Sequence, residues 1–355
     1  MPSFPLVSII IPVFNGSERI RASFQNLQSM HYTNWEVLYI DNNSTDNSLE
    51  EIEYLKQNNP KQIRVFQENK QGVAFARNSG IQYAKGDFLC FLDIDDNFFP
   101  DKINILIPPL LKDSTIAMSF GSTYRVYLPG EQSYIQDTGL VYSGENLPPR
   151  AGMDWLSNLS HLPQTGATIV RKDIAEKVGG FDEKVGVYDN ALWRSFSEDA
   201  AFHIKISLNY KVYFINQPVV KYFRHSSSAI SCLNHIFPAT ERYFLTHKIF
   251  TLPYTHYYLQ KTGNRYPLYW AERAAITNLT ASIQAASPIH MLTKYRSLFS
   301  SLASLRADFY LSSIYFSLFC LIHSLFPYKL AKQVIRLQNR ILYILAPKVF
   351  PLEIS

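Results

Sequence analysis

The sequence predicts an α/β protein built on a parallel, doubly wound sheet. Apolar runs rich in β-branched residues alternate with amphipathic stretches over about the first hundred residues. Polar residues follow directly after three of these runs, at Asn15, Asp41 and Asp93. Repeated β-α units of this length favour parallel strands joined by helices. Because the carboxyl ends of parallel strands share one edge of a sheet, we expect ligands to bind there.

The first part of the chain alternates between strands and helices. The run Val7–Val13 is continuous and apolar, as expected for a strand buried on both faces. The strands expected after it are Trp35–Ile40, ending at Asp41, then Ile63–Phe66 and Phe88–Leu92. The helices expected between them run from a cap at Ser17 to about Met30, through Leu49, Ile52 and Leu55, and over Val73–Ala84.

Beyond residue 101 the pattern becomes mixed. Strands are expected at Ile116–Tyr127, Ala167–Arg171, Lys211–Ile215 and Val219–Phe223, with shorter helices between them, one of them from about Glu198 to Leu208. From about residue 235 the chain becomes helical, aromatic and basic. We therefore expect one domain over residues 1–234, with halves at 1–100 and 101–234, and a helical C-terminal region over 235–355.

Composition and motifs exclude several classes of protein. A chain of 355 residues that is 47% hydrophobic and 18% charged is typical of a folded globular protein. Its three cysteines are far apart, which indicates a reducing compartment and argues against a disulfide framework or a zinc site. The N-terminus lacks a basic segment before its apolar run, so it predicts a core strand rather than a signal peptide. Neither GxGxxG nor GxxxxGK[ST] occurs, which excludes a typical dehydrogenase or P-loop enzyme.

Basic charge is concentrated near the C-terminus. Residues 290–355 hold eight basic and two acidic residues, a net charge of 8 − 2 = +6, whereas the whole chain carries +5. A stretch of twenty uncharged residues at 309–328 is near membrane-spanning length but contains serines, a histidine and a proline. With the basic segment Lys332–Lys348, it predicts helices lying on an anionic membrane surface. A helical bundle packed on the first domain or on a second subunit, and a transmembrane span, are the alternatives.

An aspartate cluster follows the fourth expected strand. Asp93, Asp95 and Asp96 would repel one another unless a cation neutralised them. Carboxylate oxygens suit Mg²⁺ or Mn²⁺, and such an ion stabilises the charge that develops on a departing diphosphate. The alternative is a polar turn in which Asp96 or Asn97 caps the next helix.

Further polar residues have both functional and structural interpretations. Asp41 could accept hydrogen bonds from a base or ribose, or cap a helix. Arg77 could bind a diphosphate, with the amide of Asn78 beside it, or be a solvated helix arginine. Glu198 and Asp199 open a helix, where the helix dipole stabilises acids, and a carboxylate there could also deprotonate an acceptor hydroxyl.

Together these segments resemble the family 2 glycosyltransferases, which have the GT-A fold. The resemblance covers about residues 5–230, and the order and spacing of its motifs make it specific. The matching segments are VSIIIPVFN (Val7–Asn15), YIDNNSTD (Tyr39–Asp46), GVAFARNSGI (Gly72–Ile81), FLDIDD (Phe91–Asp96), GGFDE (Gly179–Glu183) and SED (Ser197–Asp199). One departure is Ile94, where a small residue is common, and its side chain should not coordinate a metal.

The resemblance implies a Rossmann-like domain with a mixed central sheet that binds a nucleotide-sugar and Mn²⁺ or Mg²⁺. It implies inverting transfer by direct displacement, with a UDP-sugar favoured as donor and a saccharide or lipid-linked hydroxyl as acceptor. Gly179 and Gly180 would form a turn with Phe181 packed beneath it. The implied nucleotide-sugar site comprises Pro12, Val13, Asn15, Asp41, Arg77, Asp93 and Asp95, with Asp95 and Asp93 as metal ligands, His225 as a further one, Asp199 as base and Glu198 beside it.

Two other functions remain open from the sequence. A nucleotidyl- or phosphoryl-transferase on a related scaffold would need the diphosphate site but not Asp199. A non-catalytic, membrane-associated scaffold would keep only the nucleotide pocket. For each of the three we expect a cytoplasmic protein at the inner face of a membrane, with no nucleic acid partner and with the C-terminal helices available for oligomerisation.

Overall fold

The computed structural model describes residues 4–126, 133–136, 141, 143–157, 161–183 and 198–223. All of them belong to one compact unit of the chain. Residues 235–355, including the uncharged stretch 309–328 and the expected membrane-binding helices, lie outside the described residues. Among the helices that are described, none is both long and apolar enough to cross a membrane.

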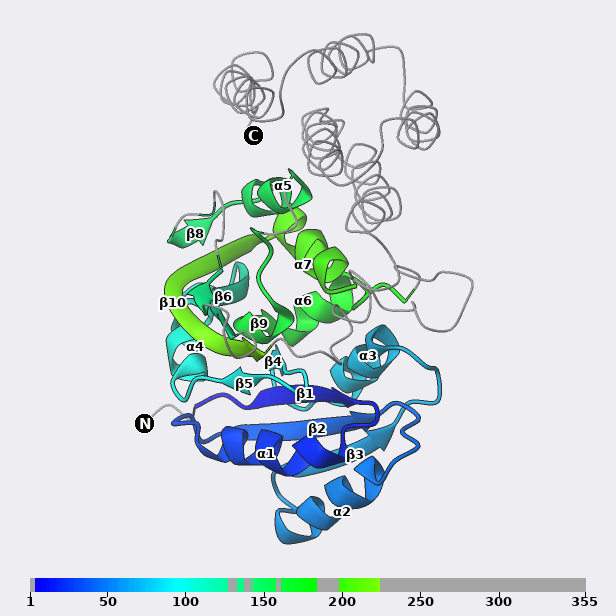
Figure 1. Cartoon of the computed structure of the whole chain (residues 1–355). Coiled ribbons are helices and arrows are strands. Elements are labelled where there is room, and N and C mark those ends of the chain that lie inside the picture. The colour runs from blue at the N-terminus through cyan, green and yellow to red at the C-terminus, as the bar shows by residue number, and fades with distance from the viewer. Residues whose placement is uncertain are drawn as a thin grey trace, which may run out of the picture. The chain divides into compact units, whose positions relative to one another are not determined.

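The predicted alternation of strands and helices over the first hundred residues is confirmed (Figure 1). β1 pairs in parallel with β2 and β4, and β2 pairs in parallel with β3. The elements are β1 (Val7–Val13), α1 (Ser17–Gln28), β2 (Trp35–Asp41), α2 (Ser48–Asn58), β3 (Ile63–Gln67), α3 (Val73–Tyr83) and β4 (Phe88–Phe91). α1 and α2 lie on one side of β1–β3, and α3 lies on the other (Figure 1).

The start and the end of α1 differ from the prediction. Ser17 is the first residue of α1 and not its cap, because Gly16 precedes the helix without a side-chain hydrogen bond. The backbone N–H of Ser17 instead donates to the Asp46 carboxylate at 3.1 Å, so the capping acceptor comes from the loop after β2. α1 ends at Gln28 rather than Met30.

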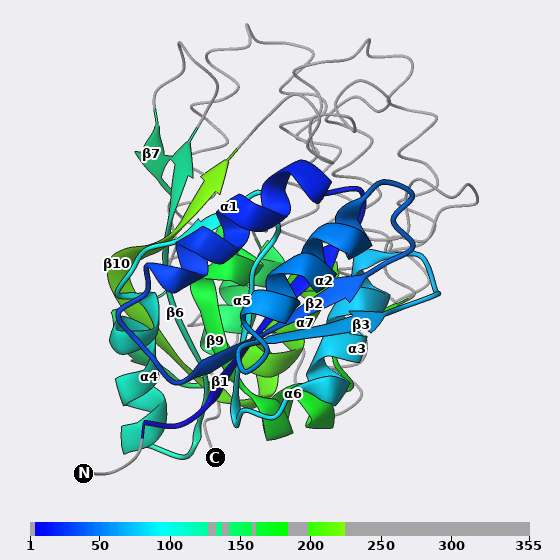
Figure 2. The same ribbon diagram turned by 90° about the horizontal axis from the view of Figure 1, so that it is seen from below.

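The second half completes a mixed sheet, as expected from the family resemblance. Its strand order is β3-β2-β1-β4-β9-β6-β10-β5, and β9 runs antiparallel to both β4 and β6. The elements are β5 (Asn97–Phe98), α4 (Lys102–Lys112), β6 (Ile116–Val126), β7 (Tyr134–Ile135), β8 (Gly144–Asn146), α5 (Arg150–Ser157), η2 (Thr165–Ala167), β9 (Thr168–Arg171), α6 (Lys172–Lys177), α7 (Glu198–Asn209) and β10 (Lys211–Phe223). Figure 2 shows β6 and β10 running side by side to the same edge.

The prediction of two strands within residues 211–223 was wrong, because β10 is one strand. Its parallel pairing with β6 shifts register between Ile215 and Pro218 and again between Pro218 and Val220. Proline has no N–H for the ladder, so an irregularity at this point is the expected consequence. The sequence pattern also did not locate α4, which contains Pro108 and Pro109 in its interior.

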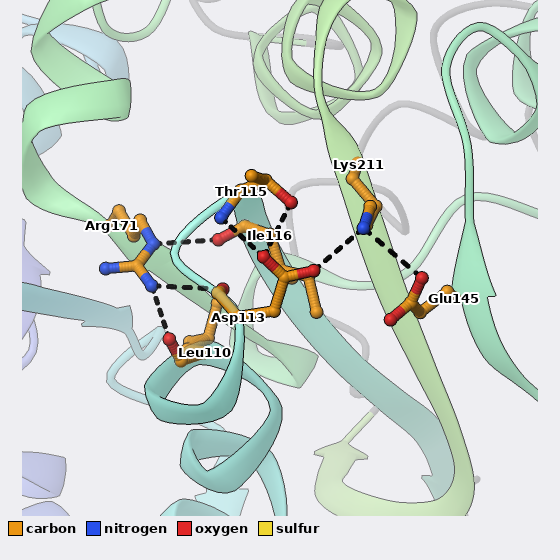
Figure 3. Close-up of polar contacts among 7 residues, drawn as sticks. All are labelled: Leu110, Asp113, Thr115, Ile116, Glu145, Arg171 and Lys211. Carbon is orange, nitrogen blue, oxygen red and sulfur yellow. Dashed lines mark hydrogen bonds and ion pairs between the residues drawn. The ribbon is translucent and has the colours of Figure 1, made fainter.

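A polar cluster joins α4, β6, β9 and β10 at the start of β6 (Figure 3). The Arg171 guanidinium donates to the carbonyl oxygens of Leu110, Asp113 and Ile116, which satisfies acceptors at the end of α4. Lys211 contacts the Asp113 carboxylate at 2.7 Å and Glu145 at 3.3 Å. These contacts link the end of α4 to the sheet, at the end opposite to the carboxyl ends of β6 and β10.

A lysine that has no carboxylate partner within the described part of the chain is buried in the core next to β5. Lys102 is fully buried, and its Nζ lies 3.5 Å from the centre of the Phe98 ring. Burial lowers the pKa of Lys102 from 10.5 to about 8. Below pH 8 the folded protein therefore holds a desolvated ammonium, and this cost disappears only as the pH rises from 8 toward 10.5.

Replacing Lys102 by methionine is expected to stabilise the protein. The lowered pKa corresponds to about 3 kcal/mol at pH 7, because each pKa unit is worth about 1.4 kcal/mol. Chemical denaturation of Lys102→Met at pH 7 and pH 10 measures this gain, which should shrink at the higher pH. Lys112→Met, at the exposed end of α4, is the control and should change stability little. A loss of stability in Lys102→Met would contradict this account.

Candidate active site

The candidate site begins where β1 and β2 end side by side. Val13 and Asp41 are register partners at the carboxyl ends of these strands, and the Asn42 N–H donates to the Val13 carbonyl at 2.8 Å. The Val13 side chain is buried in the core, and Pro12 before it is half-buried. The residue following Val13 is Phe14, whose ring is 54% exposed. This edge therefore presents an exposed aromatic ring close to the end of β2.

Asn15 and Asn42 hold the loops around this edge. The Asn15 side-chain oxygen accepts from the Thr45 N–H at 2.7 Å, so its carbonyl ties the loop after β1 to the loop after β2. The Asn42 amide donates to the carbonyls of Glu68 and Lys70 and accepts from the Gly72 N–H at 2.7 Å. Asn42 therefore places the start of α3 beside the same edge.

Asp41 is a buried carboxylate at the end of β2. It is 4% exposed, and within the described part of the chain its Oδ1 atom has no hydrogen-bond partner. The interpretation of Asp41 as a helix cap is wrong, because α2 begins at Ser48 after Asn47. A buried acceptor without a partner is costly, so a donor group such as that of a nucleotide base would be favoured there.

The three aspartates of the cluster have different surroundings. The Asp93 side chain is 41% exposed, whereas the Asp95 side chain is 26% exposed and lies 3.6 Å from Arg19. Asp96 is buried and accepts from the Phe223 N–H at 3.0 Å, at the end of β10. Burial, and then Asp93 and Asp95, raise the pKa of Asp96.

The alternative of a capping turn for this cluster is also wrong. α4 begins at Lys102 and is preceded by Asp101, five residues beyond Asp96. Ile94 packs against the hydrophobic core and faces Gly16. Asp93 and Asp95 are thus partly exposed carboxylates, which pair with Arg77 and Arg19 respectively.

Arg77 is buried between Asp93 of the aspartate cluster and Glu198 of α7. Its guanidinium contacts Glu198 Oε1 at 2.6 Å and Asp93 Oδ1 at 2.7 Å, and its Cζ lies 5.2 Å from the centre of the Phe181 ring. Burial alone would lower the pKa of Arg77, but the neighbouring acids Asp93 and Glu198 raise it, so the residue stays charged. With 3% of its surface exposed, Arg77 is not the solvated helix arginine of the structural interpretation.

Glu198 and Asp199 lie in the first turn of α7 and differ in accessibility. Glu198 is buried, whereas Asp199 is half-buried and accepts from the Ala200 N–H at 2.7 Å. Burial and then Asp199 raise the pKa of Glu198 to about 8, although Arg77 opposes this. Burial also raises the pKa of Asp199, and Arg77 again opposes it. Of the two, Asp199 is the carboxylate that an acceptor hydroxyl could reach.

The predicted glycine turn is present beneath Arg77. Gly179 and Gly180 have φ angles of +78° and +63°, in the left-handed region that favours glycine. Phe181 is buried after them and stacks on Phe202 at 4.3 Å between ring centres. The expected turn at Gly179 and Gly180 is thus present, and Phe181 after it is buried.

Two residues of the site region were missed from the sequence. Phe14 could have been found as an aromatic residue directly after a buried strand end. His203 is fully buried one turn after Asp199, burial and then Arg77 lower its pKa to about 3, and neither ring nitrogen has a partner among the described residues. No sequence signal distinguished His203 from an ordinary apolar helix position.

The donor set fits a divalent ion in part. Asp93 and Asp95 supply accessible hard oxygen ligands, and Mg²⁺ or Mn²⁺ commonly completes its coordination with water and phosphate oxygens. Over the described ranges, no three His, Cys, Asp or Glu side chains are arranged to hold a metal. His225, the expected further ligand, lies outside the described residues.

Comparison with known proteins decides the family. The family model described as Glycosyl transferase family 2 matches residues 8–179. Glycosyltransferase GlyG of Streptococcus pneumoniae serotype 4 is 29% identical over 231 residues, which cover 63% of this chain and 72% of GlyG. The chain belongs to glycosyl transferase family 2. This glycosyltransferase is therefore an enzyme that transfers a sugar from a nucleotide-sugar.

Two further relatives of the glycosyltransferase carry more specific names. The UDP-Glc:alpha-D-GlcNAc-diphosphoundecaprenol beta-1,3-glucosyltransferase WfgD of Escherichia coli is 35% identical over 117 residues, covering 33% of this chain and 45% of WfgD. The crystal structure of S. aureus TarS 1-349 in complex with UDP-GlcNAc has a TM-score of 0.52 at 18% identity, covering 68% of this chain and 65% of that one. The second likeness supports the fold alone. The chain thus spans less than half of WfgD and about two thirds of the TarS fragment.

Proposed function

We propose that this glycosyltransferase moves a sugar from a nucleotide-diphosphate-sugar, preferably a UDP-sugar, to a hydroxyl of a saccharide or lipid-linked acceptor. The transfer inverts the configuration at the anomeric carbon of the sugar. The observation that carries the proposal is the position of Arg77, which contacts Asp93 on the donor side and Glu198 on the acceptor side. One site therefore joins a nucleotide edge to the first turn of α7. The name of WfgD supports a UDP-sugar donor and a lipid-linked acceptor.

In this proposal the acceptor and the leaving group are handled by opposite sides of the site. The oxygen of the acceptor hydroxyl attacks the anomeric carbon while Asp199 takes the proton of that hydroxyl. The bond between the anomeric carbon and the diphosphate breaks in the same step. Glu198 orients the acceptor, and Arg77 holds the Glu198 carboxylate in place. Because attack and departure occur on opposite faces of the sugar, the anomeric configuration inverts without a covalent intermediate.

The nucleotide would lie along the ends of β1 and β2. Pro12 and Val13 frame the base, and the exposed Phe14 ring offers a stacking surface. Asp41 Oδ1, which has no hydrogen-bond partner among the described residues, accepts a donor group of the base. Asn15 shapes this pocket through its bond to Thr45. Asp93 would face the ribose, as the family resemblance implies.

A panel of nucleotide-sugars tests this pocket. UDP-, GDP- and dTDP-sugars are added with and without Mn²⁺, and thermal unfolding is followed, because a bound ligand stabilises the folded state by mass action. The UDP-sugars should stabilise most. Phe14→Ala should weaken that binding about tenfold by loss of stacking, while Tyr54→Ala, an equally exposed ring on α2, should not. If none of the nucleotide-sugars raised the melting temperature, the proposal would be refuted.

Asp95 and Asp93 would hold Mn²⁺ or Mg²⁺, with His225 as a further ligand. When bound, the ion supplies positive charge that stabilises the departing diphosphate. Arg19, which lies 3.6 Å from the Asp95 carboxylate, would then compete with the ion for that carboxylate. Asp96 is not needed as a ligand, because it binds the Phe223 N–H.

Replacing Asp95 by alanine is expected to weaken Mn²⁺-dependent donor binding at least about tenfold, because a direct oxygen ligand is lost. Titration of Mn²⁺ at a fixed UDP-sugar concentration, followed by calorimetry, measures this effect. Asp101→Ala removes an exposed aspartate after β5 that pairs with His31, and it should bind as the wild type does. Equal affinity in Asp95→Ala and the wild type would remove Asp95 from the site.

We further propose a boundary near residue 234, after which residues 235–355 bind an anionic membrane surface at the cytoplasmic side or mediate oligomerisation. The net charge of +6 over residues 290–355 supports the membrane. Deleting residues 300–355 should release the protein from phosphatidylserine vesicles without abolishing donor binding, as sedimentation with vesicles would show. Failure of the full-length protein to bind these vesicles would contradict this part of the proposal.

A further inference from the structure

The glycine turn beneath Arg77 is bound from two helices at once. Asn78 of α3 donates to the Phe181 carbonyl at 2.9 Å and accepts from the Phe181 N–H at 2.8 Å. Lys205 of α7 donates to the Gly180 carbonyl at 2.6 Å and to the Val178 carbonyl at 3.1 Å. The main chain of the turn therefore links α3 to α7 through hydrogen bonds from Asn78 and Lys205.

The shape of the turn is fitted to Asn78. Gly180 has a φ angle of +63°, and a Cβ atom at this position would overlap the Asn78 amide. Asn78 also donates to Glu183 at 3.0 Å. Because only glycine allows both the backbone conformation and this close approach, the turn and the amide fix each other's position.

The turn carries the aromatic ring on which Arg77 rests. The Phe181 ring lies 5.2 Å from the Arg77 guanidinium carbon, and its other neighbours are Phe202 at 4.3 Å and Phe91 at 5.0 Å between ring centres. A shift of the turn would therefore move the ring that supports the guanidinium, and with it the two ion pairs of Arg77.

The two helices that hold the turn also carry the reacting groups. Asn78 directly follows Arg77 in α3, and Lys205 lies seven residues after Glu198 in α7. Residues seven apart share one face of a helix, so Glu198 and Lys205 face the same side of α7. The same pair of helices is thus joined twice, by the pair Arg77–Glu198 and by the glycine turn.

We propose that Asn78 and Lys205 are positioning residues for sugar transfer, which fix the Gly179–Phe181 turn between α3 and α7 and so hold Arg77 against Glu198. The inference rests on the proposed function of Asp199 as the base. The acids that face Arg77 are Asp93, Glu198 and Asp199, and Arg77 lowers the pKa of Asp199 against the effect of burial. Loosening the turn would therefore change the protonation of the base as well as its position.

The test uses the full-length enzyme and the variants Lys205→Met and Asn78→Ala. Both should lower kcat about 10- to 100-fold with the KM for the donor within about twofold of wild type, because small misplacements at a reacting centre cost this much. The acidic limb of the kcat profile should move to higher pH by about one unit, since Arg77 no longer favours the ionised base. Lys205→Arg, which keeps its donors, should restore most of the activity.

A matched control separates positioning from general stability. Lys172 of α6 also donates to a helix-end carbonyl, that of Ala84 at 2.7 Å, and Lys172→Met should leave the pH profile unchanged. If Lys205→Met and Asn78→Ala both keep the wild-type acidic limb, the proposal is overturned. If Asn78→Ala does not fold, Lys205→Met alone decides, because methionine retains the apolar stem of the side chain.

An arm without turnover keeps this proposal separate from the proposed function. In ¹⁵N-labelled protein the guanidinium N–H signals of buried Arg77 should exchange slowly with water, and they should be lost in Lys205→Met but kept in Lys172→Met. Retention of these signals in Lys205→Met would also overturn the positioning role. If wild-type enzyme transfers no sugar from any nucleotide-sugar, the proposed function fails, while this arm still reports whether the turn holds Arg77.

Discussion

Replacing Asp199 by asparagine is expected to lower the rate of sugar transfer about 10²- to 10⁴-fold, the usual contribution of a general base. Asparagine has a similar shape and can still accept from the Ala200 N–H, so the start of α7 should be unchanged. It cannot take the proton of the acceptor hydroxyl. Donor binding should be unaffected, because in the proposal the nucleotide contacts residues of β1, β2 and the aspartate cluster. Steady-state kinetics with the UDP-sugar identified by the panel, and calorimetry with the same donor, measure the two quantities.

A helix-start aspartate on α6 provides the control for Asp199. Asp173 is exposed and occupies the first turn of its helix, so Asp173→Asn loses the same interaction with the helix dipole. Its transfer rate should stay at the wild-type value. Wild-type turnover in Asp199→Asn would mean that another group is the base.

Replacing Arg77 by methionine is expected to destabilise the protein by about 3–5 kcal/mol at pH 9, where Glu198 is ionised, since it leaves a buried carboxylate without its partner. Glu198 is buried, and its Oε2 atom has no other hydrogen-bond partner among the described residues. The double variant Arg77→Met/Glu198→Gln should recover a large part of the loss, because no buried charge then remains at residue 198. Chemical denaturation of the single and double variants measures both values.

The pH dependence of this effect follows from the raised pKa of Glu198. The folded value is about 8 and the unfolded value is 4.5, so the folded protein binds the extra proton between these limits and loses stability as the pH rises through them. Without Arg77 the folded pKa rises further, and the loss should extend above pH 8. Arg77→Met should therefore lower the melting temperature, relative to the wild type at the same pH, by more at pH 9 than at pH 5.

A second arginine paired with a buried glutamate supplies the control for Arg77. Arg64 contacts Glu36 at 3.0 Å, but Glu36 also accepts from the Ser8 hydroxyl and the Lys85 N–H, each at 2.7 Å. Arg64→Met should thus cost only about 1 kcal/mol, because the carboxylate keeps two donors. Equal losses in Arg64→Met and Arg77→Met would show that Glu198 is satisfied in some other way.

Local sequence patterns predicted the first half of the fold because its units are short and regular. Val7–Val13 was predicted with its bounds, and the strands ending at Asp41 and before Asp93 were placed correctly within a residue or two. The later elements were harder. β10 contains Pro218 within one strand, and α4 contains two prolines, so residues that normally end elements lie inside them. Pairing with β6 and packing against the sheet override those local signals.

The sequence by itself determined that polar residues gather at one edge of an α/β sheet and which family motifs they form. It left Arg77 as either a diphosphate ligand or a surface residue, and Asp41 and Asp96 as either functional residues or caps. Only the tertiary structure removed the surface interpretation of Arg77 and the capping interpretations of Asp41 and Asp96. Arg77 and Glu198 are 121 residues apart in the chain, and their contact depends on how α3, α7 and the Gly179–Phe181 turn pack together. Burial of a charge and its pairing with another are properties of that packing, and no local pattern encodes them.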